Sequence, residues 1–140
     1  MNQSLIFLPM FILVTLTYIV AITMVRGRFS AVKNQQVDSD YYRVFVGDTE
    51  PDSLRQVSRH YANLFELPIL FYAACIVAYV SSSVDWVMLL LSVVFVIARI
   101  LHAYVHITSN RLLFRMRIFG LGFATLGAIW VYLCVSIFTQ

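Results

Sequence analysis

The sequence predicts an all-α integral membrane protein, a single-domain four-helix bundle over residues 1–140. Of these residues 61% are hydrophobic and only 12% are charged, and the apolar residues come in runs rather than in the scattered pattern of a soluble core. Four runs each approach the roughly 20 residues that cross a bilayer as a helix. A membrane-spanning barrel would need many more segments, of about ten alternating residues each.

The predicted spans cover roughly residues 5–25, 59–80, 85–106 and 115–138. The first run carries no charge, and no basic segment precedes it. It also lacks a small-residue cleavage site before the cluster at Arg26, so it is expected to stay in the protein as a helix rather than to be removed as a signal peptide.

Two residues interrupt the predicted spans. Pro68 has no backbone N–H, so it should leave the carbonyl of Leu64 without its helical partner and bend the second span. A local bend that opens a cavity is one interpretation, and a tolerated membrane proline is the other. Arg99 places a cation inside the third span, where charged groups are costly.

Basic residues mark the expected orientation of the chain. All ten lie within residues 26–59, at Arg99 or within residues 111–117. The positive-inside rule therefore places both connections in the cytoplasm and both termini on the non-cytoplasmic side of the cell (inner) membrane. Because these cations flank spans and acids balance those of the first connection, the net charge of +3 predicts no nucleic-acid partner.

A polar stripe opens the second span. Arg59, Asn63 and Glu66 stand at i, i+4 and i+7, which places them within an arc of about 60° on one helix face. Polar groups at membrane depth are costly and usually serve a function.

A second stripe lies in the third span, where Arg99, His102 and His106 stand at i, i+3 and i+7. Counted from the cytoplasmic side, Glu66 and Arg99 are both about 10 Å deep. An unpaired arginine there costs roughly 2.5 to 3.5 kcal/mol, so we expect Glu66 and Arg99 to form an ion pair.

Three interpretations of these stripes remain open. They can form a buried clamp between the second and third spans, or a pocket for an anionic ligand, which the excess of arginine at this mouth favours. His102 and His106, with His60 at a similar depth, can also face one metal ion. Because two helical histidines without a nearby carboxylate or thiolate are a weak pattern, we expect no metal site.

The two motifs, Arg59-x-x-x-Asn63-x-x-Glu66 with a following proline and Arg99-x-x-His102 with downstream arginines, resemble the MAPEG family, membrane-associated proteins in eicosanoid and glutathione metabolism. The resemblance covers nearly the whole chain and is to microsomal glutathione transferases in particular. It implies a homotrimer of four-helix subunits in the lipid bilayer, with glutathione as co-substrate bound between adjacent protomers near the cytoplasmic face.

The resemblance also implies an activity and the residues that perform it. The expected function is a glutathione-dependent transferase or peroxidase that activates the thiol against a lipophilic electrophile or hydroperoxide. Arg115 is the expected thiol-activating residue, and Arg111 is its competitor for that role. The expected glutathione-binding residues are Arg59, Asn63, Glu66, Arg99, His102, His106 and Arg111.

Two departures from the family pattern stand close to these residues. His106 replaces the tyrosine that the eicosanoid enzymes carry one turn beyond the second motif, and Met116 replaces the serine that follows the activating arginine in the prostaglandin-forming enzyme. Eicosanoid synthesis is therefore not predicted. The alternative function is a non-catalytic protein of this fold that binds a lipid or an anionic metabolite.

Overall fold

The computed structural model describes residues 1–47 and 49–139; Asp48 and Gln140, which belong to the predicted domain, lie outside the described residues. All regular structure in the described part is helical. The elements are the short 3-10 helix η1 (Gln3–Ile6) and the α-helices α1 (Phe7–Lys33), α2 (Tyr41–Val44), α3 (Asp52–Asn63), α4 (Leu67–Val80), α5 (Trp86–Ile107) and α6 (Leu112–Phe138).

Four helical segments of the described chain are long and apolar enough to cross a membrane. They are Gln3–Lys33, Asp52–Val80, Trp86–Ile107 and Leu112–Phe138. The predicted all-α class is confirmed, and the protein is an integral membrane protein.

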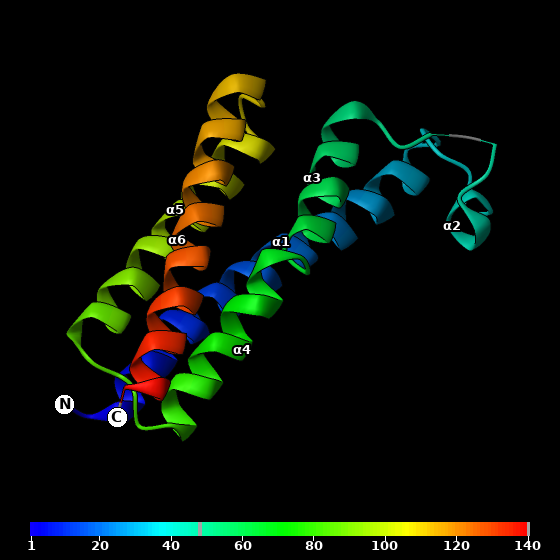
Figure 1. Ribbon diagram of the computed structural model, residues 1–140. Helices are drawn as coiled ribbons and strands as arrows, with labels where there is room; N and C mark the ends of the chain where they lie inside the picture. The colour runs from blue at the N-terminus through cyan, green and yellow to red at the C-terminus, as the bar shows by residue number, and fades with distance from the viewer. Residues whose placement is uncertain (48, 140) are drawn as a thin grey trace.

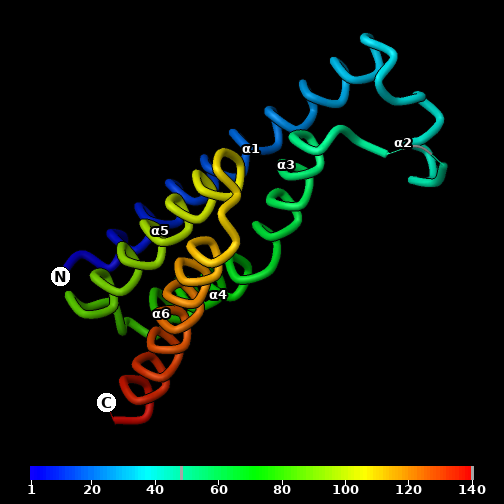
Figure 2. The backbone as a smooth tube through the Cα atoms, turned by 90° about the horizontal axis from the view of Figure 1, so that it is seen from above, coloured from blue at the N-terminus to red at the C-terminus, as the bar shows by residue number. Residues whose placement is uncertain are grey.

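The helices place both termini and the α4–α5 turn at one end of the bundle (Figure 1). The long connection that carries α2 and the connection from α5 to α6 lie at the other end. Helices α5 and α6 pack along each other, and α1 contacts α3, α4 and α5. Seen from above, α3 runs beside the later part of α1 (Figure 2).

Apolar packing is densest toward the end that holds the termini. Leu13, Phe71, Phe95 and Ile129 are fully buried there, and the rings of Phe71 and Phe95 stack with their centroids 4.6 Å apart. Lipid tails are as apolar as these side chains, so close packing rather than removal from water holds the helices together. This rigid half fixes the helices that carry the polar residues at the other end.

Helix α1 is longer than its apolar run. Together with η1, the helix contains the predicted span over residues 5–25 and continues to Lys33 through residues that are compatible with helix. This extension packs on α3, where a Cβ atom at Gly27 would lie 2.6 Å from Cδ1 of Leu54. The Nε atom of Arg28 also pairs with Oε1 of Glu50 at 2.9 Å. Glycine at position 27 therefore permits the close approach of α3.

The second span is broken rather than merely bent. The predicted span over residues 59–80 is made of two helices, since α3 starts at Asp52 and ends at Asn63, and α4 starts at Leu67. Glu66 has φ −95° and ψ −95°, outside the helical region. Pro68 is the second residue of α4, where a helix does not need the missing N–H. The interruption lies just before the proline that signalled it.

Asp85 fixes the start of α5. Its Oδ1 atom accepts a hydrogen bond from the backbone N–H of Met88 at 2.9 Å, and Oδ2 accepts one from the hydroxyl of Tyr132 in α6. One carboxylate therefore caps α5 and ties it to α6. The third and fourth spans agree with their predicted positions, although α6 begins at Leu112 rather than at residue 115.

Asp85→Ala should lower the free energy of unfolding by about 0.5 to 2 kcal/mol, the usual value of an N-cap, because it removes the acceptor for both donors. Thermal unfolding in detergent measures this change. Asp85→Asn, which keeps one acceptor oxygen, is the matched control and should lose less.

The same carboxylate predicts a pH dependence. Partial burial raises the pKa of Asp85, but hydrogen bonds from Met88 and Tyr132 outweigh it and hold that pKa below its ordinary value of 3.8. The stabilisation is therefore present above that ordinary value and lost as pH falls through the folded-state pKa. Acidification should destabilise the wild type more than Asp85→Asn; equal acid sensitivity of the two would contradict this assignment.

Candidate functional site

Two adjoining pockets lie between α3, α5 and α6 at the end opposite the termini. The first has a volume of about 270 Å³ and is lined by Asn63, His102, His106, Arg115, Met116 and Phe119. The second, of about 240 Å³, shares His106 and Arg115 and is further lined by Asp52, Arg55, Gln56, Arg59 and Asn110. We refer to them as the inner and the outer pocket.

Arg99 is a buried cation next to the inner pocket. Its side chain is 1% exposed, and its Nη2 atom donates a hydrogen bond to the carbonyl oxygen of Asn63 at 3.2 Å. Its guanidinium carbon also lies 5.9 Å from the ring centroid of Phe119. In the described part of the chain, Nε and Nη1 have no hydrogen-bond partner. Arg99 therefore keeps two donor groups for a ligand.

The break in the second span makes this hydrogen bond possible. In an uninterrupted helix the carbonyl of Asn63 would accept from the N–H of Leu67. Because α3 ends at Asn63, its nearest backbone donor is the N–H of Glu66 at 3.4 Å, and the carbonyl can also accept from Arg99.

The expected ion pair between Glu66 and Arg99 is not formed, and that prediction is wrong. No such pair occurs within residues 1–47 and 49–139, and Glu66 is exposed in the single chain. The chain changes direction after Asn63, so the helical alignment of Glu66 with Arg59 is lost. Arg59 is also exposed and lines the outer pocket, whereas Asn63 is half-buried.

The second stripe lies on the buried face of α5, as its spacing predicts. Arg99, His102 and His106 are 1%, 3% and 4% exposed. The ring of His102 packs against Phe119 of α6 with the centroids 5.6 Å apart. The α5–α6 hairpin thus supplies most of the lining of the inner pocket.

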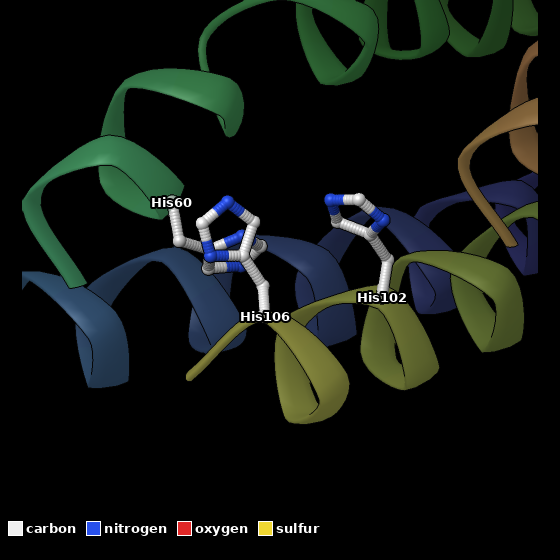
Figure 3. A group of neighbouring side chains, drawn as sticks. All are labelled: His60, His102 and His106. Atoms are coloured by element: carbon white, nitrogen blue, oxygen red, sulfur yellow. The ribbon is translucent and has the colours of Figure 1, made fainter. Parts of the chain in front are cut away.

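His60 joins the two histidines of α5, and sequence reasoning left it out of the binding residues. It comes from α3, is fully buried, and its ring centroid lies 5.6 Å from that of His102 and 5.1 Å from that of His106 (Figure 3). One nitrogen from each ring lies within 4.8 Å of the others, so the cluster can hold a metal ion. The helical spacing of His60 from buried Val57 and Leu64 was the signal for its inward orientation.

Arg115, in the first turn of α6, is the arginine that reaches both pockets. Its Nη1 atom donates to Oδ1 of Asn110 at 2.6 Å and lies 3.4 Å from Nε2 of His106. Arg111 is the N-cap residue of α6, is exposed, and lines neither pocket. Sequence reasoning missed Asn110, whose backbone turns at φ 45° and which holds Arg115 in place.

A larger apolar pocket lies on another side of α3, against α1. Its volume is about 510 Å³, and it is lined by Val14, Thr17, Tyr18, Ala21, Tyr61, Leu64, Phe65, Ile69 and Tyr72. The phenolic groups sit among aliphatic side chains, so this pocket fits a lipophilic ligand rather than a charged one.

A comparison with protein families assigns the chain. The model of the MAPEG family matches residues 6–135, which is nearly the whole length, so this protein belongs to the MAPEG family. The resemblance carried by the two polar motifs is confirmed. No curated protein and no solved structure matched the chain.

Replacement of Arg99 tests whether it is a structural clamp. Arg99→Met removes a buried charge that has no ion pair, but it also takes away the shorter of the two hydrogen bonds to the Asn63 carbonyl. These effects oppose each other, so the free energy of unfolding should change by less than about 1 kcal/mol. Chemical or thermal unfolding in detergent measures it. A clamp would instead lose about 3 to 5 kcal/mol, similar to the core variant Phe71→Ala.

Proposed function

We propose that this MAPEG protein binds glutathione in the inner and outer pockets and activates its thiol. The observation that carries the proposal is the guanidinium of Arg115, which Asn110 holds where the two pockets meet. Asp52 is the only acid among the described lining residues, and it already pairs with Arg55. The site therefore favours an anionic ligand.

The chemistry requires a cation near the sulfur. A free thiol with a pKa near 8.5 is mostly protonated at neutral pH, and the thiolate is the nucleophile. Lowering the thiol pKa by one to two units takes about 1.4 to 2.7 kcal/mol of differential interaction. Arg115 can supply this interaction in a partly dry pocket, with the proton released to water.

The activated sulfur would then react with a lipophilic partner. In the transferase reaction the sulfur forms a bond to an electrophilic carbon, and the bond from that carbon to its leaving group breaks. In the peroxidase reaction the sulfur attacks the terminal oxygen of the hydroperoxide, the O–O bond breaks, and the alkoxide takes a proton to become the alcohol. The resulting sulfenic acid reacts with a second glutathione to give the disulfide and water.

Met116 and Phe119 give the inner pocket an apolar wall on which the lipophilic partner can lie beside the sulfur. Met116 is 59% exposed in this chain, so entry from lipid is open. The 510 Å³ apolar pocket lies on another side of α3 and shares no lining residue with the inner or the outer pocket.

Two exposed charged residues next to the site are evidence for an assembly of several copies of the chain. Arg59 and Glu66 are charged and exposed in the single chain, although they lie at membrane depth, where charges need partners. A second copy packed against these two residues would cover them and complete the glutathione site. We therefore infer a homotrimer with its cationic end in the cytoplasm of the cell and its termini on the opposite side.

One observation favours a second candidate function, a non-catalytic protein that binds a lipid or an anionic metabolite. The Nε2 atom of His106 lies 3.4 Å from Nη1 of Arg115, so it can accept a hydrogen bond from this guanidinium. Arg115 would then stabilise the thiolate of a bound ligand less. Binding would persist while the thiol stayed protonated.

Titration of the purified protein with glutathione distinguishes the two. At pH 7 the wild type should show saturable ultraviolet absorbance of a thiolate, because Arg115 stabilises the anion. Arg115→Ala should lower the ratio of thiolate to thiol in bound glutathione at least tenfold, since one pKa unit changes that ratio tenfold. Glutathione affinity should fall less.

Arg111→Ala is the matched control, because Arg111 lies one turn before Arg115 and lines neither pocket. It should keep the thiolate signal. If the wild type shows no signal at millimolar glutathione although the ligand binds, the non-catalytic function is correct. If Arg111→Ala loses the signal and Arg115→Ala keeps it, the assignment of the activating arginine is wrong.

A further inference from the structure

We propose that His60, His102 and His106 form a binding site for a divalent transition-metal ion with the coordination preference of zinc. These are the only three histidines of the sequence, and the fold brings all of them together from α3 and α5. Figure 3 shows the three side chains turned into one space between these helices. This inference replaces the expectation that the chain holds no metal.

Burial without partners is the first observation. The three rings are 0%, 3% and 4% exposed. In the described part of the chain, both nitrogens of His60, both nitrogens of His102 and Nδ1 of His106 have no hydrogen-bond partner. Buried polar atoms in folded proteins are nearly always satisfied by protein, water or an ion. Five unsatisfied imidazole nitrogens in one place therefore indicate a missing ligand.

The geometry of the cluster fits a single ion. One nitrogen from each ring lies within 4.8 Å of the other two. Zinc–nitrogen bonds of about 2.0 to 2.1 Å in a tetrahedral site place the nitrogens roughly 3.3 Å apart. Side-chain rotations that shift each nitrogen by about 1 Å close this difference, and neutral imidazoles suit zinc and its neighbours in the periodic table.

The charges around the cluster determine its fourth ligand. Arg99 lies one turn from His102 on α5, and Arg115 is 3.4 Å from Nε2 of His106. Three neutral imidazoles leave the ion its full charge, so the fourth position takes water, which the ion acidifies to hydroxide, or a thiolate. The inner pocket, lined by His102, His106 and Arg115, has space for it. Arg115 can then donate to that anion instead of repelling the ion.

Three protein ligands with one open position are the arrangement of catalytic rather than structural zinc sites. The bound ion would also join α3 to α5 across the break in the second span. Neither role depends on glutathione, so the metal site and the proposed glutathione activity can be tested separately.

The direct test is a metal titration of the full-length chain. The protein is purified in detergent on an affinity tag without histidine, stripped with a chelator, and titrated with Co²⁺ and then Zn²⁺. We expect one Co²⁺ per chain with the intense visible bands of tetrahedral coordination, displaced by one equivalent of Zn²⁺. A weak octahedral spectrum, or binding far below one equivalent, would overturn the proposal and leave an imidazole cluster without a metal.

Variants assign the ligands. His60→Ala, His102→Ala and His106→Ala should each weaken Zn²⁺ binding at least tenfold. Tyr104→Ala removes an exposed ring from the same turn of α5 and should bind as the wild type does. Wild-type affinity in all three histidine variants would refute the site.

His60→Cys keeps the test decisive if an alanine variant fails to fold. A thiolate can replace imidazole as a ligand, so this variant should still bind Co²⁺ and should gain a thiolate-to-metal charge-transfer band in the near ultraviolet. If the folded variant binds Co²⁺ without that band, position 60 is not a ligand and the three-histidine site is wrong.

Discussion

The polar end of the bundle depends on the break in the second span, where α3 stops at Asn63. The break frees the backbone carbonyl of Asn63 from the next helical turn, so that the buried Arg99 of the third span can donate to it. One hydrogen bond to a neutral acceptor offsets only a small part of the desolvation cost of a buried guanidinium. The remaining donors of Arg99 are consistent with a site that is completed by a ligand, rather than with a finished structural clamp.

The two ends of the bundle differ in composition: one is an apolar core and the other holds the polar pockets. Around the termini, stacked aromatic and aliphatic side chains such as Phe71 and Phe95 make a tightly packed core. At the other end α3 and the α5–α6 hairpin enclose pockets lined by arginine and histidine. Charged groups at membrane depth are costly, so the packed half must supply the stability that the polar half lacks.

Hydropathy and spacing predicted the spans and the buried stripe of α5, because both depend on local sequence. They did not predict the full length of α1, since a helix can leave the membrane and continue through residues such as Arg28 when it packs on a neighbour. Pro68 signalled a disturbance but not its position, and after the change of chain direction Glu66 interacts with Arg99 only electrostatically, beyond ion-pair distance. His60 was missed as a site residue because its partners come from another helix. These failures share one cause, which is tertiary packing.

The proposal that the site turns bound thiol into thiolate is tested most directly by counting protons. Calorimetric titration with glutathione at pH 7, in buffers of different ionisation enthalpy, gives the number released per ligand bound. A thiol pKa lowered by one to two units predicts release of between about 0.2 and 0.7 proton, and none for S-methylglutathione, which has no thiol proton. Binding of both ligands with no proton release would show that the pocket holds the thiol without activating it.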